Sequence, residues 1–259
     1  IINTSRLSLI DSIWILGAVI LIVGNAYMAT AANFDLAIGR FALHMDERIT
    51  FDGVQRILHP ENFKAFWSSV IDGNDHRYGR SLWNSIATAS LLPTYFFGDT
   101  GQIISSRMLQ VLLLTATFLV LAQTFVRNQI LKTILLMALF AMPNPEYFMT
   151  IPKPEPLQIF FLAVFLFFYK KNDLAFGRHW IFLGLAFGTK ISTLPLIIVF
   201  TGLSFFLCKH KLYEELQQKQ FWTAFSYSLL GLGLAVPILL APVLAGILAY
   251  LLFRWISAK

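Results

Sequence analysis

The chain has 259 residues, of which 57% are hydrophobic and 13% are charged. A soluble domain is usually about 45–50% apolar and about 25% charged, so this composition predicts a protein with several membrane-spanning helices. The formal net charge of +6 does not indicate nucleic-acid binding, because the basic residues lie in short clusters between apolar runs, as in cytoplasmic loops. The single cysteine, Cys208, excludes an internal disulfide bond.

The apolar runs predict the membrane-spanning helices, since one such helix needs about 20 mostly apolar residues. Residues 10–30 are the first candidate, and this run is longer than the roughly 7–15 apolar residues of a signal peptide. A polar stretch over 31–102 follows, in which the amphipathic residues 81–97 are expected at the membrane interface or packed on other helices. Further helices are expected at residues 103–126, 129–142, 157–169, 180–189 and 192–207, and at 221–237 and 242–255 as two helices or one kinked helix. The expected fold is therefore all-α, a single module over residues 1–259 with about seven or eight transmembrane helices.

The basic residues of the short loops predict the orientation, because Lys and Arg are enriched in cytoplasmic loops. Alternating spans place three polar segments together on the opposite face: the long loop 31–102, the proline-rich loop 143–156 and the junction 188–190. An integral membrane protein with loop 31–102 outside the cytoplasm is expected, in a bacterial inner membrane or, in a eukaryote, the endoplasmic reticulum. The basic residues that set this orientation are Arg127, Lys132, Lys170, Lys171, Arg178, Lys209, Lys211 and Lys219.

The densest charge cluster of the chain is "HMDERITFD", residues 44–52, which contains three carboxylates, a His and an Arg. The acidic pair Asp46 and Glu47 could form a solvated turn or cap a helix that begins near Arg48. The same loop also contains further acids and the cations Arg77 and Arg80, which could face an anion. A binding or catalytic site is the alternative to the solvated turn.

Three further segments place charge next to apolar runs. In "IPKPEP" the prolines predict a rigid, extended loop that holds Lys153 and Glu155. Lys190 lies within "LAFGTKISTLPLII", where a lysine costs roughly 2.5–3.5 kcal/mol on insertion scales, and the break at Gly188 favours a ligand-lined position. Arg107 lies near the start of the span 103–126. Snorkelling to the interface is the alternative explanation for the cations.

Several common motifs are not found in the sequence. It contains no phosphate-binding Walker A loop, no dinucleotide-binding glycine fingerprint, no His-Glu-x-x-His and no cysteine-based metal signature. Chemistry on a membrane-embedded substrate is therefore favoured over nucleotide chemistry.

Four segments in order resemble the GT-C superfamily of glycosyltransferases, which use polyprenyl-phosphate-linked sugars and include protein O-mannosyltransferases and aminoarabinose transferases. "HMDERITFD" is similar to the acidic motif of the first extracytoplasmic loop in that family, and "SSRMLQVLLLTATFLVLAQTFVRN" to its second membrane helix. "NPEYFMTIPKPEPLQIFFLAVFLFF" and "GLAFGTKISTLPLIIVF" are similar to the later loop and to the glycine-rich helix junction. The resemblance covers about residues 10–208, the N-terminal helical module of commonly longer proteins.

The resemblance implies transfer of a sugar from a polyprenyl-phosphate donor to an acceptor on the extracytoplasmic side. Asp46 would be the general base, with Glu47 as the second candidate. Cations would hold the leaving phosphate. Some relatives use a divalent ion, but no spacing here is specific for a metal, so no metal or other cofactor is expected. The residues implied in binding the substrate or lipid phosphate are Arg107, Lys153, Glu155 and Lys190, with Arg77 and Arg80 as further candidates.

Two other functions compete with the transferase. The first is an inactive scaffold or accessory subunit of a membrane complex, which the short chain favours. The second is a transporter, since broken helices with intramembrane charge also occur there. No inverted internal repeat is evident in the sequence, which disfavours the transporter. The expected partners are the lipid-linked sugar, membrane lipids and, for the scaffold, other subunits.

Overall fold

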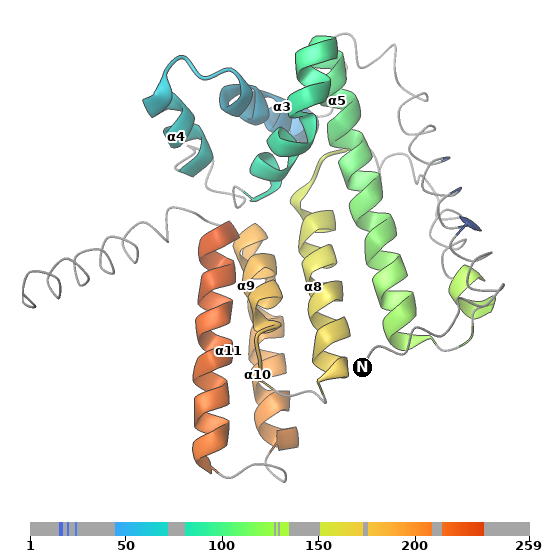
Figure 1. Ribbon diagram of the computed structural model, residues 1–259, viewed down its shortest axis with the longest axis vertical. Helices are drawn as coiled ribbons and strands as arrows, with labels where there is room; N and C mark the ends of the chain where they lie inside the picture. The colour runs from blue at the N-terminus through green and yellow to red at the C-terminus, as the bar shows by residue number, and fades with distance from the viewer. Residues whose placement is uncertain are drawn as a thin grey trace, which may run out of the picture. The chain divides into compact units, whose positions relative to one another are not determined.

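In the computed structural model most of the described residues are helical, and none of them forms a strand (Figure 1). This confirms the predicted all-α class for that part of the chain. The chain divides into two compact units, one formed by Ile1–Asp52 and Thr88–Phe167, the other by Gly53–Ala87 and Phe168–Lys259. The described residues are 16, 17, 20, 24, 45–71, 81–126, 128, 130–134, 151–172, 176–208 and 214–235.

Three helices contribute residues to both units: α3 (Met45–Leu58), α5 (Ser81–Phe125) and α8 (Pro154–Lys171). The second unit also contains α4 (Phe63–Ile71) and a series of helices from the C-terminal half. That series is α9 (Trp180–Thr189), the short 3₁₀ helix η1 (Ile191–Thr193), α10 (Leu194–Cys208) and α11 (Glu214–Ala235).

Helix α5 joins two segments that the sequence predicted as separate, residues 81–97 and 103–126. It runs for 45 residues with a kink at Gly98, whose backbone lies at φ 59° and ψ −144°. Glycine reaches such a positive φ without the steric penalty that a Cβ would add. The interruption between the two predicted segments is therefore a one-residue bend and not a loop.

The number of membrane spans remains a prediction. Among the described residues, α5 is the one helix both long and apolar enough to cross a membrane, by length and composition. Shorter apolar helices cover Trp180–Thr189 and Ile191–Phe206. The predicted span at 242–255 and most of those at 10–30 and 129–142 lie outside the described residues.

The N-terminus of α8 corrects the expectation for "IPKPEP". Only residues 151–153 are irregular, and the helix starts at Pro154, so Glu155 lies in the first helical turn and not in an extended loop. Proline is favourable at a first helical position because its missing N–H would have no partner there. An acidic residue in the first turn also interacts favourably with the helix dipole.

The predicted break between residues 180–189 and 192–207 is confirmed. Helix α9 ends at Thr189, and Lys190 is extended at φ −155° and ψ 129° before η1 and α10 follow. An aromatic cluster joins neighbouring elements of this unit, because the Phe176 ring lies 5.0–5.6 Å from the rings of Trp180, Phe205 and Phe221.

Helices α9 and α11 lie side by side with their backbones in direct contact (Figure 1). A Cβ placed on Gly184 would lie 1.9 Å from the carbonyl oxygen of Ser228, and one on Gly231 would lie 2.0 Å from that of Ile181. Gly188 faces the same helix, where a Cβ would meet Ala235 at 2.5 Å. We call these three glycines the glycine seam. Small residues at such spacing let helices approach closely in membrane proteins.

We expect Gly184→Ala to destabilise the protein by about 1–3 kcal/mol, the usual cost of overpacking. The added methyl group would meet backbone atoms of α11, which cannot rotate away as a side chain could. Gly202→Ala on α10 is the matched control, because a Cβ there has no neighbour within 4 Å. Unfolding in detergent micelles measures both. Equal stability of the two variants would contradict the close contact of α9 and α11.

Candidate functional site

A buried ion pair joins the acidic motif to the long helix of the first unit. The Arg107 guanidinium on α5 donates through Nε to Glu47 Oε1 at 2.7 Å and through Nη2 to Glu47 Oε2 at 3.0 Å. Both residues are buried, with 4% of Glu47 and 7% of Arg107 exposed. Two parallel bonds between a guanidinium and a carboxylate fix both position and orientation. The pair therefore anchors the first turns of α3 on α5.

Two glutamines extend this anchoring along α5, and both are fully buried. Gln102 Nε2 donates to the Phe51 carbonyl at 3.1 Å, which holds α3. Gln110 Nε2 donates to the Lys153 carbonyl at 3.2 Å, which holds the residues just before α8. The same side of α5 thus binds two segments that lie far apart in the sequence.

A direct contact between those two segments completes the arrangement. Thr50 Oγ1 on α3 donates to the Pro152 carbonyl at 3.4 Å, across 102 residues of sequence. The acidic motif and the "IPKPEP" segment are therefore neighbours in the first unit. We call this assembly of α3, α5 and residues 151–155 the acidic corner.

The predicted site residues of the acidic corner have different surroundings. Lys153 and Glu155 are both half-buried, beside the start of α8. Glu47 and Arg107 bind each other, so each has a partner within the protein. The sequence had predicted a catalytic role for Glu47 and a phosphate-binding role for Arg107. Asp46 lies in the first turn of α3, and its side chain is outside the described residues.

The remaining predicted residues belong to the second unit. Lys190 follows the last residue of α9, and its backbone N–H donates to the Ala186 carbonyl at 3.1 Å. A cation near the C-terminus of a helix interacts favourably with the helix dipole. The neighbouring Thr189 Oγ1 lies 3.0 Å from Ser81 Oγ at the start of α5. Arg77 and Arg80 lie outside the described residues, although Arg80 directly precedes Ser81 in the sequence.

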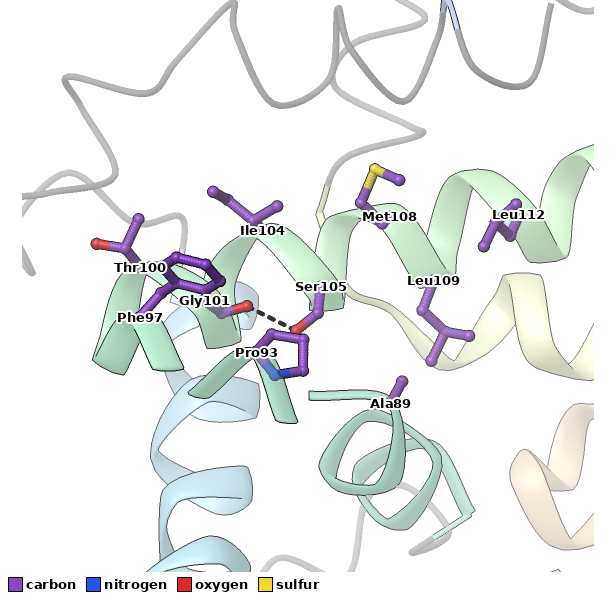
Figure 2. Close-up of a pocket in the computed structure, with 10 residues that line it drawn as sticks. All are labelled: Ala89, Pro93, Phe97, Thr100, Gly101, Ile104, Ser105, Met108, Leu109 and Leu112. Carbon is purple, nitrogen blue, oxygen red and sulfur yellow. Dashed lines mark hydrogen bonds between the residues drawn. The ribbon is translucent and has the colours of Figure 1, made fainter. Parts of the chain in front are cut away.

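An apolar pocket of about 580 Å³ lies at the bend of α5 (Figure 2). Pro93 and Phe97 line it from the part of the helix before Gly98, and Ile104, Met108 and Leu112 line it from the part after. Ser105, also at its edge, turns its hydroxyl to the Gly101 carbonyl at 2.7 Å. The lining thus presents hydrocarbon surface, which suits an apolar chain.

Sequence analysis did not single out Gln102, Gln110 or Thr50. The sequence does contain one signal for Gln110. It is a polar residue inside an apolar run, and it follows Arg107 by three residues in "RMLQVLLL". Residues three or four apart share a helix face, so a buried glutamine beside a buried arginine indicates a polar contact surface.

Within the described residues, no group of three His, Cys, Asp or Glu side chains is close enough to hold a metal ion. No model of a known protein family matches this chain, and no characterised protein or solved structure does so either.

Proposed function

We propose that this protein is a membrane glycosyltransferase that moves a sugar from a polyprenyl-phosphate donor to an acceptor on the extracytoplasmic side. The observation that carries the proposal is the acidic corner. Two charged motifs, the acidic segment and "IPKPEP", are joined by the Thr50 bond to Pro152, and α5 holds both of them through Gln102 and Gln110. A transferase of this kind needs a carboxylate base and a cation for the leaving phosphate near each other.

In this proposal the two carboxylates Asp46 and Glu47 have different roles. Glu47 already accepts two bonds from Arg107, so both of its carboxylate oxygens are bonded within the protein. We therefore assign the general base to Asp46, its neighbour on α3. Glu47 serves to hold the acidic motif on α5.

The candidate phosphate-binding cations also differ in their roles. Arg107 is bound to Glu47, and Lys153 is our first candidate for the lipid phosphate because it is a half-buried cation next to Pro152, which contacts the acidic segment. Lys190, Arg77 and Arg80 remain further candidates, as the sequence predicted. The apolar pocket at the bend of α5 supports the proposal because it offers hydrocarbon surface of the kind that a polyprenyl chain needs.

We expect Lys153→Gln to weaken binding of polyprenyl phosphate about tenfold or more, the usual value of a hydrogen bond to a charged group. Binding is measured by titrating the purified full chain in detergent with polyprenyl phosphate. Lys153→Arg should restore part of the affinity because it restores the charge.

Lys64→Gln is the matched control, because Lys64 is an exposed cation on α4. Its affinity for polyprenyl phosphate should equal that of the wild type. If Lys153→Gln binds as tightly as Lys64→Gln, the phosphate assignment is wrong. If the wild type binds no polyprenyl phosphate at all, the inactive scaffold becomes the better explanation.

A further inference from the structure

A second pocket, of about 670 Å³, lies in the second unit between α9, α11 and the end of α8. The stacked rings of Phe168 and Phe182, 5.9 Å apart with planes 6° from parallel, form an aromatic wall. Polar side chains also line it: Arg178, Asn172, Gln220 and Tyr227. Such a mixture of aromatic surface and convergent polar groups is typical of a ligand site.

The charge around this pocket is positive. Arg178 lines it and is exposed, and the exposed Lys171 on α8 directly precedes the lining residue Asn172. On α11 the exposed Lys219 precedes the lining residue Gln220. The sequence between residues 168 and 182 contains three cations and one acid, Asp173, so its formal net charge is 3 − 1 = +2.

We infer that this pocket binds the phosphate headgroup of an anionic phospholipid from the cytoplasmic leaflet. The cations supply the charge complementarity, and the amide groups of Asn172 and Gln220 can bond the phosphate and glycerol oxygens. The acyl chains would lie along α11, where the exposed Leu230 and Leu234 follow the lining residue Tyr227 by three and seven residues and so lie on the same side of the helix. Basic pockets between membrane helices on the cytoplasmic side recognise anionic headgroups for these reasons.

The inference rests on the membrane orientation in the proposed function, in which Lys170, Lys171 and Arg178 are cytoplasmic. It does not depend on glycosyl transfer. The site is far in sequence from the acidic motif, and none of its residues has a role in the proposed reaction. A protein that transfers no sugar would still bind the lipid here, so the two proposals fail separately.

The test titrates the purified full chain, in detergent micelles, with dioleoylphosphatidylglycerol or dioleoylphosphatidylcholine and counts bound lipids by native mass spectrometry. We expect phosphatidylglycerol to bind at least fivefold more tightly than phosphatidylcholine. Arg178→Gln should lower the phosphatidylglycerol affinity about fivefold, the contribution of one basic residue at an anionic surface. Lys64→Gln, which removes an exposed cation on α4, should leave it unchanged.

Three outcomes would overturn the inference. The first is equal affinity for the two lipids. The second is an Arg178→Gln variant that binds phosphatidylglycerol as tightly as the wild type. The third is complete displacement of phosphatidylglycerol by excess inorganic phosphate, which would assign the pocket to a free anion and not to a lipid. Since Arg178 is exposed, its substitution leaves the fold intact, and a melting curve of each variant verifies this.

Discussion

Arg107→Met is expected to lower the free energy of unfolding by about 3–5 kcal/mol, because it leaves the Glu47 carboxylate buried without its partner. Burial makes this loss far larger than that of a surface ion pair, which contributes about 0–1 kcal/mol. Unfolding of the purified full chain in mixed micelles, titrated with a denaturing detergent, measures the difference.

The double variant Glu47→Met/Arg107→Met should recover much of that stability. Removing both charges eliminates the unpaired carboxylate, and replacing a buried pair by apolar side chains is often neutral. Arg48→Met is the matched control, because Arg48 is an exposed arginine on α3 beside Glu47, and its effect should stay within about 0.5 kcal/mol. An Arg107→Met variant as stable as Arg48→Met would show that the pair does not anchor α3.

Asp46→Asn is expected to reduce sugar transfer by about 10²–10⁴-fold, the range for loss of a general base. Asparagine keeps the size of the side chain and removes the charge that accepts the proton. The measurement follows the loss of radiolabelled sugar from its polyprenyl-phosphate carrier in proteoliposomes that contain the purified full chain.

Asp52→Asn serves as the control for this experiment, because Asp52 is an exposed carboxylate farther along α3. Its turnover should stay close to that of the wild type. The Asp46→Asn variant must also melt at the wild-type temperature, so that lost turnover reports chemistry and not unfolding. Wild-type turnover in a folded Asp46→Asn variant would refute the assignment of the base.

The sequence predicted the helical elements well where local signals are strong. Residues 180–189 were predicted with the bounds that α9 has, because a continuous apolar run ends in Gly188-Thr189-Lys190. The continuation of α5 past Gly98 was missed, since the stretch Gly98-Asp99-Thr100-Gly101 between two apolar runs looks like the end of a helix. The prolines of "IPKPEP" predict a rigid loop, but proline also favours a first helical position, and Pro154 begins α8.

The hydrogen-bond and ion-pair partners in the acidic corner could not be predicted from such local signals. The sequence offered several cations for the acidic motif, among them Arg48, Arg77 and Arg107, and nothing local distinguishes them. The choice of Arg107 for Glu47 depends on how α3 packs against α5 over 60 residues of separation. The bond from Gln110 to the Lys153 carbonyl likewise depends on tertiary packing, because a backbone acceptor leaves no trace in the sequence.

The glycine seam has a mechanical consequence. Where two helices meet backbone to backbone, there are no intervening side chains whose rotation could let one helix slide or tilt against the other. Helix α9 has 10 residues and is about 15 Å long, and its backbone contact with α11 holds it rigidly against that helix. Its two ends carry Arg178 with the lipid pocket and Lys190 with the helix break. A displacement at either end of α9 would therefore move α9 and α11 together as one rigid body and would not bend α9.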